Sequence, residues 1–418
     1  MVNLNFIKNY ECTLCHRLYQ PNATVMTCPV CGELGILEIN YDYLAMKKVV
    51  NRDYFKNNQD YTMWRYTPLM SIEQRPEMAL KVGWTPLYQT LNLQKAVGFD
   101  LIYVKDEGLN PTGSLKDRAS AVGICKALES NASVIACSST GNAASSLAGN
   151  AAKMGMKAVI FVPKRAPKGK LAQLGIYGAE VILVDGDYKD AFALSKEAIA
   201  QYGWYNRNAA INPHLIEGKK TVAYEIAEQM DFKPTDWVVV SVGDGCTIGG
   251  VYKGFKDLYE LGLIDKIPKL LGVQAEGCAP FYEAWIKHRD ILETEENTIA
   301  DSIAVGIPRN PQKAIQAVRQ SMGAWITVSD QEILFAMSLL GKTEGIFGEP
   351  AGVAGLAGLI KAKQTGLILT HESITVIVTG NGLKDTVNAM KAIKEPIFIK
   401  PDLNLLKPLL NELKKEKL

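Results

Sequence analysis

The 418-residue sequence predicts an α/β protein built on parallel sheets, with a small metal-binding module near its amino terminus. Short apolar runs that fit buried strands alternate with helical stretches along most of the chain. Turns containing Gly or Ser follow these strands, and four cysteines are grouped within residues 12–31. Strands that alternate with helices at this spacing indicate βαβ units, in which the strands lie parallel.

The grouped cysteines form two C-x2-C pairs separated by twelve residues. They are Cys12, Cys15, Cys28 and Cys31. This spacing is close to that of a zinc ribbon, in which each pair supplies two thiolates to one tetrahedral ion. Four thiolates would fill the coordination shell, so the expected zinc is structural. Free or oxidised dithiols, or iron in place of zinc, also fit these ligands.

Composition and charge argue against several classes of protein. The chain is 47% hydrophobic and 22% charged, which is typical of globular proteins. A net charge of +2 argues against strong binding to nucleic acid or to a membrane surface. No apolar run reaches the roughly 18 residues of a membrane span, and no secretory signal is recognisable. The other four cysteines are scattered singly, which fits a reducing compartment, so we expect a cytoplasmic protein.

An alternating run at residues 101–106 predicts the first strand of the main body. The segment Asn110-Pro-Thr-Gly-Ser-Leu-Lys116-Asp-Arg follows it, and we expect a helix over residues 119–128. Lys116 therefore stands at a Gly-containing turn, where a ligand approaches the backbone closely and N–H groups favour anions. A lysine with a lowered pKa in such a place forms Schiff bases with carbonyl compounds. A solvated lysine at an ordinary helix start is the alternative.

Three further strand–helix units are predicted. The strands cover residues 133–137, 157–162 and 180–184, and the helices cover 143–154, a basic stretch through 175, and 188–201. The loop Ser138-Ser-Thr-Gly-Asn142 lies at the carboxyl end of its strand, where ligands bind in such sheets. Its small polar residues and the helix start behind it suit a carboxylate or phosphate, although a plain loop is the alternative.

The second half of the chain repeats the pattern. We expect a helix over residues 211–230 and a buried strand over 237–242, followed by Gly243-Asp-Gly-Cys-Thr-Ile-Gly-Gly. Gly-rich turns between a strand and a helix cradle phosphates through backbone N–H groups. The spacing here is not that of the dinucleotide fingerprint, so a nicotinamide site is not expected. Further strands are predicted at residues 270–274 and 374–379.

Five of these motifs, in this order, resemble those of the pyridoxal-phosphate (PLP) enzymes with the tryptophan synthase β-like fold, and threonine synthases in particular. They are Asn110–Arg118, Ser138–Asn142, Asn212-Pro-x-x-x-Glu-Gly-x-Lys-Thr221, Glu349-Pro-Ala351 and Thr379-Gly-x-Gly-Leu-Lys-Asp385. The resemblance covers roughly residues 60–390. It implies two open, twisted parallel-sheet domains, an amino-acid substrate and a homodimer.

The resemblance also implies domain boundaries. They are residues 1–40 for the zinc-ribbon-like module, 41–120 with 206–395 for the large PLP-binding domain, 121–205 for the small substrate-binding domain, and 396–418 for a tail.

The resemblance further assigns roles to the matching residues. Lys116 would hold PLP as a Schiff base and then move a proton near the substrate's α-carbon. Asn142 would donate to the phenolic oxygen of the cofactor, and Thr379 would face its pyridine nitrogen. The cofactor phosphate would be bound by Gly243, Asp244, Gly245, Cys246 and Thr247. The substrate's α-carboxylate would be bound by Ser139, Thr140 and Gly141.

The substrate side departs from the family's pattern. Threonine synthases convert O-phosphohomoserine and water into threonine and phosphate, so they need a second anion clamp. Related sequences are expected to carry Asn-Ser and Asn-Pro-x-Arg near residue 210, with a hydroxyl just after the Ser138–Asn142 loop. This chain has Ala143, Ala209, Ala210 and Leu215 at those places. Asp244 also replaces the usual asparagine, and beside a phosphate its carboxylate would be repulsive unless it turns away.

The sequence therefore predicts PLP-dependent elimination or replacement at Cβ or Cγ of an amino acid, with threonine synthase as the nearest named activity. The alternative is a lyase or dehydratase acting on an unphosphorylated amino acid such as serine, threonine or diaminopropionate. Ala209, Ala210 and Leu215 favour that alternative. A non-enzymatic sensor or nucleic-acid-associated protein that kept the fold is the remaining class, and the intact Lys116 motif argues against it.

Overall fold

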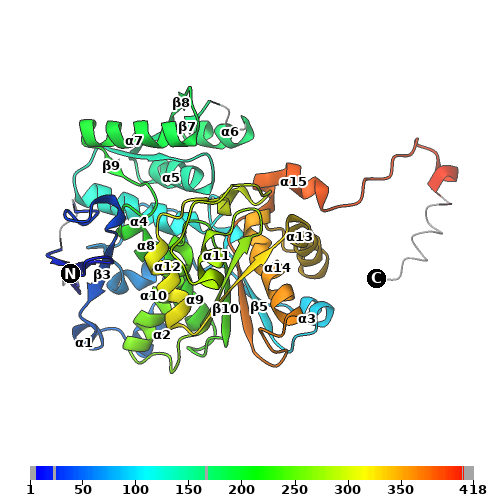
Figure 1. Cartoon of the computed structure of the whole chain (residues 1–418), viewed down its shortest axis with the longest axis horizontal. Coiled ribbons are helices and arrows are strands. Elements are labelled where there is room, and N and C mark those ends of the chain that lie inside the picture. The colour runs from blue at the N-terminus through cyan, green and yellow to red at the C-terminus, as the bar shows by residue number, and fades with distance from the viewer. Residues whose placement is uncertain (1–5, 22–24, 165–167, 407, 409–418) are drawn as a thin grey trace.

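Three sheets organise the protein (Figure 1). The computed structural model describes residues 6–21, 25–164, 168–406 and 408. A six-stranded sheet and a four-stranded sheet form the main body, and a small three-stranded sheet lies at the amino-terminal side. The predicted fold class, two parallel α/β sheets with a small amino-terminal module, is confirmed.

The six-stranded sheet has the order β12-β11-β10-β13-β5-β4. In that order its strands are Ala324–Val328, Lys269–Ala275, Trp237–Ser241, Ile374–Val378, Ile102–Asp106 and Leu87–Gln89. The edge strand β4 is antiparallel to β5, and the other neighbouring pairs are parallel. All five residues of β10 are buried, as expected for a parallel strand covered by helices on both faces.

Helices cover both faces of this sheet. The helices α14 and α13, with α3 beside them, pack on one face, and α10 and α12 pack on the other, with α9 against α10. Their bounds are Pro350–Gln364 for α14, Asp330–Glu344 for α13, Leu91–Val97 for α3, Cys246–Glu260 for α10, Pro311–Gln320 for α12 and Thr221–Gln229 for α9. The shorter α11, Pro280–Lys287, and α15, Thr386–Lys391, flank these layers.

The four-stranded sheet is parallel throughout, with the order β8-β7-β6-β9. Its strands are Glu180–Val184, Lys157–Pro163, Val134–Ser138 and Tyr205–Asn206. Its helices are α4 Lys116–Glu129, α5 Asn142–Lys153, α6 Lys168–Ile176 and α7 Tyr188–Tyr202. Because α4 also packs on α8, His214–Lys219, these two helices connect the small sheet to the large one.

The amino-terminal sheet has the order β2-β1-β3, with strands Leu18–Tyr19, Ile7–Cys12 and Leu37–Tyr41. The chain continues through α1 Tyr43–Met46, α2 Arg52–Asn57 and a 3-10 segment, η2 Met63–Leu69. This arm contacts α9, and its Arg65 pairs with Glu228 at 2.5 Å. This arm therefore packs across the main body through buried residues.

Buried charges attach β3 to the helices of the large sheet. Lys253 on α10 pairs with Glu38 on β3 and, at 2.7 Å, with Glu217 on α8. Lys313 on α12 lies 2.8 Å from Glu38 as well, and the hydroxyl of Tyr41 donates to Glu217. Burial alone would raise the pKa of Glu217, but the adjacent Lys220 and Lys253 hold it below its ordinary value.

The predicted boundaries differ from the structure in three places. The first site helix begins at Lys116 rather than residue 119. The helix expected from residue 211 begins at His214 and is interrupted at Lys220. The edge strands β4 and β12 were not predicted. The start of the basic stretch before α6 falls partly outside the described residues.

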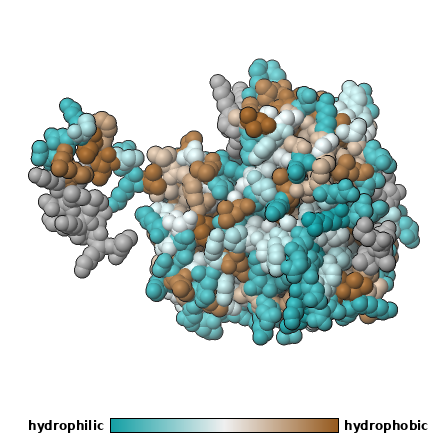
Figure 2. Space-filling view, turned by 180° about the vertical axis from the view of Figure 1, so that it is seen from behind, coloured by the Kyte–Doolittle hydropathy of each residue, from teal (hydrophilic) through white to brown (hydrophobic). Residues whose placement is uncertain are grey.

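The described part of the tail extends from the main body in Figures 1 and 2 and exposes apolar side chains. Phe398 is 92% exposed, and Ile397 and Leu403 are also exposed. No helix in the described part of the chain combines the length and apolar character that a bilayer crossing requires.

Candidate active site

A cavity of about 520 Å³ opens between the two large sheets, where the loops after β6, β10 and β13 meet the start of α4. The residues proposed for the cofactor and substrate all line it. They are Lys116, Ser139, Thr140, Gly141, Asn142, Gly243, Asp244, Gly245, Cys246, Thr247 and Thr379. The cavity thus stands at the carboxyl ends of parallel strands, as the rule for open α/β sheets requires.

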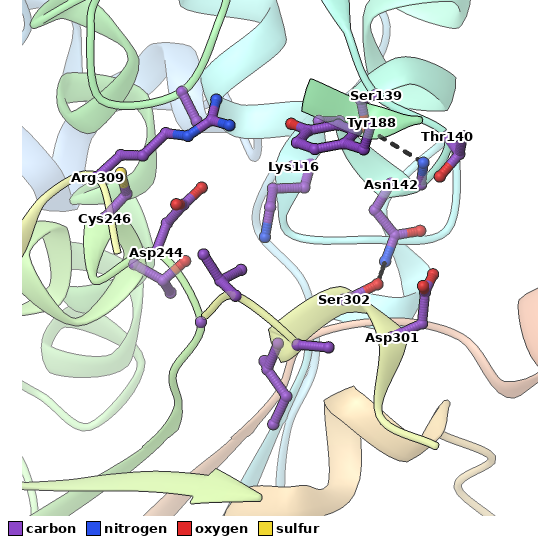
Figure 3. A pocket seen from close by; sticks show the side chains of 18 of the residues that line it. Lys116, Ser139, Thr140, Asn142, Tyr188, Asp244, Cys246, Asp301, Ser302 and Arg309 are labelled. Carbon is purple, nitrogen blue, oxygen red and sulfur yellow. Dashed lines mark hydrogen bonds between the residues drawn. The ribbon is translucent and has the colours of Figure 1, made fainter. Parts of the chain in front are cut away.

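Lys116 is the first residue of α4, and its amine points into the cavity (Figure 3). Burial is the main cause that lowers the pKa of Lys116, to about 8. The positive charge of Lys219 is the second cause. The turn before it is fixed to the end of β13, since the amide of Leu115 donates to the carbonyl of Thr379 at 2.9 Å. Gly113 has a φ of +84°, which a side chain would strain.

The loop after β6 presents its polar atoms beside Asn142, the first residue of α5. The Asn142 amide donates to Glu349 at 2.6 Å and lies 3.5 Å from the hydroxyl of Ser302. The amide of Gly141 donates to the hydroxyl of Ser139 at 3.1 Å. Figure 3 shows Asn142 and Ser302 on one side of Lys116 and Asp244 with Cys246 on the other.

The glycine-rich loop between β10 and α10 forms a backbone cradle. Gly245 has a φ of +84°, and a Cβ there would lie 2.7 Å from Ala314 and 2.8 Å from the carbonyl of Asn310. The first two residues of the 15-residue helix α10, Cys246 and Thr247, line the cavity, so the helix begins at its wall. Such a helix start favours a phosphate. Asp244 lines the cavity, and its buried Oδ1 has no hydrogen-bond partner among the described residues.

The cavity also contains polar and charged residues to which the sequence had assigned no role. Glu349, Asp301 and Ser302 lie beside Asn142, and four basic side chains line other parts of the wall: Lys189, Arg207, Lys219 and Arg309. We expected a pocket poor in anion-binding groups, because Ala209, Ala210 and Leu215 are apolar. Those positions are indeed buried or partly buried, but the cations come from other positions. The sequence signal that could have indicated cations in this cavity is the pair of consecutive lysines at residues 219 and 220.

The four amino-terminal cysteines are brought together. One sulfur atom from each lies within 4.8 Å of the other three. Gly35 makes this close approach possible, since a Cβ there would lie 2.6 Å from the Cβ of Cys28 and 2.7 Å from that of Cys31. This donor set fits one tetrahedral ion. Ile36, the next residue, shares a small buried cluster with Ala210 and Cys246 and so joins the module to the cavity wall.

Comparisons with known proteins agree with this site. The family model for the pyridoxal-phosphate dependent enzymes matches residues 78–380. Threonine synthase from Methanocaldococcus jannaschii is 41% identical over 407 residues, which are 96% of this chain and 99% of that protein. Threonine synthase from Methanosarcina acetivorans is 38% identical over 95% of this chain and 97% of that protein.

Solved structures show the same fold. Diaminopropionate ammonia lyase from Escherichia coli has a TM-score of 0.65 at 22% identity, over 82% of this chain and 94% of that one. The maize serine racemase has a TM-score of 0.62 at 24% identity, over 79% of this chain and 92% of that one.

The chain belongs to the pyridoxal-phosphate dependent enzymes. Within that class its full-length relatives identify it as a threonine synthase-like enzyme. The cavity fits the cofactor: a cradle that a Cβ would fill faces a lysine whose pKa is lowered to about 8.

Proposed function

We propose that the enzyme converts O-phosphohomoserine and water into threonine and phosphate. In this reaction the Cγ–O bond breaks as phosphate leaves and Cγ gains a proton, while Cβ loses a proton and gains the hydroxyl of water. The observation that carries the proposal is Lys116, whose pKa is lowered to about 8 between a carboxylate-binding loop and a phosphate cradle. The two full-length threonine synthase relatives support the same reaction.

We infer that this chain's own residues hold the reactants as follows. The N–H groups of residues 243–247 bind the cofactor phosphate, and Lys116 holds the cofactor through its Nζ. The loop of Ser139, Thr140 and Gly141 would hold the substrate's α-carboxylate, and Asn142 and Thr379 would bind the cofactor ring. PLP, when bound, supplies an electron sink for charge that develops on the substrate carbons.

Lys116 also moves the protons in this proposal. With the cofactor and substrate bound, the Lys116 Nζ would accept the proton of the substrate's α-carbon. Its lowered pKa keeps part of the amine unprotonated near neutral pH, as a general base requires. The neutral hydroxyl of Thr379 would stabilise a protonated cofactor ring less than a carboxylate would, which would favour elimination and replacement over transamination.

A second candidate is a lyase or dehydratase acting on an unphosphorylated amino acid. Ala143, Ala209 and Ala210 favour it, because they offer no hydrogen-bond donor from their side chains. Purified enzyme is assayed for threonine and phosphate from O-phosphohomoserine, and for keto acid or ammonia from serine, threonine and diaminopropionate. Absence of threonine from the first substrate contradicts the threonine synthase reaction.

The role of Lys116 has its own test. Holoenzyme is expected to be yellow, and borohydride is expected to fix the cofactor on the peptide that contains Lys116. Lys116→Ala is expected to abolish turnover while the thermal melting of the protein is retained. Labelling of another lysine contradicts the assignment.

We further infer that the four cysteines hold a structural zinc ion and that the enzyme is a homodimer. The clustered thiols support the zinc, and the resemblance to the family supports the dimer. The sheet arrangement supports a large domain of residues 41–120 with 206–395 and a small domain of residues 121–205. Metal analysis, light scattering and limited proteolysis test these three statements.

A further inference from the structure

Two buried cations in the cavity lack a carboxylate partner. The other basic side chains that are buried each form an ion pair: Arg65, Lys105, Arg118, Lys126, Lys220, Lys253 and Lys313. Lys219, at 3% exposure, makes neither a hydrogen bond nor an ion pair with any described residue. Arg207, at 2% exposure, donates to the neutral hydroxyl of Ser120 at 3.1 and 3.0 Å.

An unpaired buried charge is costly, so these two cations indicate an anion that the chain itself does not supply. Both side chains line the cavity that contains Lys116. Burial lowers the pKa of each, and a bound anion would offset that cost. Asp244 also lines this wall and its charge acts on Lys219, but among the described residues it forms no ion pair with either cation.

The two cations lie near Lys116, since the positive charge of each helps to lower the pKa of its amine. The Arg207 amide donates to the carbonyl of Ala136 on β6 at 2.9 Å, whereas a Cβ on Gly250 of α10 would lie 3.1 Å from the Cβ of Lys219. An amino acid whose α-carboxylate is held by the loop would occupy the same cavity as both cations. The α10 backbone already provides the N–H groups for a cofactor phosphate, so the cations are available to the substrate.

The packing around Gly123 explains how an arginine reaches this wall. A Cβ on Gly123 would lie 2.9 Å from Leu215 Cδ2 and 3.9 Å from Arg207 Cγ. Leu215 therefore packs on α4 beside the aliphatic part of Arg207. The guanidinium that sequence resemblance would place at residue 215 is supplied instead from residue 207, just after β9.

We propose that Arg207 and Lys219 form a subsite for a second anionic group of the substrate. The enzyme then selects α-amino acids whose side chain ends in a phosphate ester or another acidic group. An arginine beside a lysine suits such a group, because the guanidinium offers two parallel N–H donors. This inference rests on the proposed function, which sets the α-carboxylate at the Ser139–Asn142 loop.

The test is a titration of the holoenzyme's visible absorption with paired amino acids. Phosphohomoserine is compared with homoserine, phosphoserine with serine, and aspartate with asparagine. The anionic member of a pair is expected to saturate the spectral change at a concentration at least about tenfold lower. Lys219→Gln and Arg207→Gln are expected to erase this preference, and Lys219→Arg and Arg207→Lys to retain part of it. The exposed Lys95→Gln is the matched control.

The apoprotein of each variant is also titrated with PLP. An unchanged affinity for PLP, with the lost preference for anions, supports the subsite. Weakened PLP binding with an unchanged KM for phosphohomoserine overturns it, because the cations would then serve the cofactor. If the wild type makes no threonine yet prefers anionic amino acids, the proposed reaction fails and the subsite stands. If it makes threonine and the four variants keep its KM, the subsite fails alone.

Discussion

The side-chain amide of Asn142 donates a hydrogen bond to the carboxylate of Glu349 at 2.6 Å, across 207 residues of sequence. Asn142 follows a strand of the four-stranded sheet, and Glu349 precedes a helix of the six-stranded sheet. The contact therefore joins the two walls of the cavity. It also holds the side chain that we propose for the cofactor ring.

Glu349→Ala is expected to lower kcat at least about tenfold and to weaken PLP binding, because Asn142 would lose the partner that orients it. The measurement is a double-mutant cycle with Asn142→Ala, scored by PLP affinity. Non-additive losses indicate that the two residues act as a unit. Additive losses would show that Glu349 does not position Asn142.

The amine of Lys116 is expected to set the pH dependence of cofactor loading. Because its pKa is lowered to about 8, the rate at which apoprotein takes up PLP should rise with pH and level off above that value. Lys219→Gln removes a repelling positive charge, so the pKa of Lys116 should rise and the profile should move to higher pH. Asp244→Asn removes a negative charge and should move it to lower pH. Unmoved profiles would contradict this electrostatic account.

The buried charges between α8, α10 and β3 are expected to matter for stability. Lys253→Met leaves Glu38 and Glu217 with less positive charge nearby, and should lower the free energy of unfolding by about 3–5 kcal/mol. Lys256→Met, on the exposed side of the same helix, should change it by no more than about 0.5 kcal/mol. Denaturant unfolding of both variants provides the comparison.

The amino-terminal module is expected to depend on a bound metal ion for its stability. Freshly prepared protein should contain about one zinc per chain, and chelation should lower the thermal midpoint. Cys28→Ser should lose the metal, whereas Cys278→Ser, a buried thiol outside the cluster, should retain it. Less than one equivalent of any metal, with four titratable thiols in the module, would contradict the assignment.

Much of the fold could be predicted because the strands β5, β6, β7, β10, β11 and β13 are apolar runs bounded by turn residues. Buried parallel strands need this composition, so it is visible in sequence. The strand β12 lies at a sheet edge and reads Ala-Trp-Ile-Thr-Val, without flanking turn signals as clear as the others. The edge strand β4 has only three residues, which is too short for a recognisable pattern.

The residues of the site likewise divide into those that the sequence could reveal and those that it could not. Lys116 and the loops after the strands lie in local motifs, so neighbouring residues identify them. Arg207 lies outside these motifs and Lys219 takes an unspecified position in one of them, and a basic residue in a polar stretch is usually solvated. Their burial depends on α4 and on α10, which are distant in sequence. The role of Glu349 likewise depends on a partner 207 residues away.

The attachment of β3 to α10 and α12 has a consequence for synthesis of the chain. Glu38 meets Lys253 after 215 further residues, and the carbonyl of Leu37 meets Lys313 after 276. At roughly 5–20 residues per second, the ribosome delivers Lys253 on the order of 10–40 seconds after Glu38. During that part of translation, the carboxylate of Glu38 on the amino-terminal strand is therefore unpaired, because its lysine partners have not yet been synthesised. Chaperone binding or early metal loading would act in that interval.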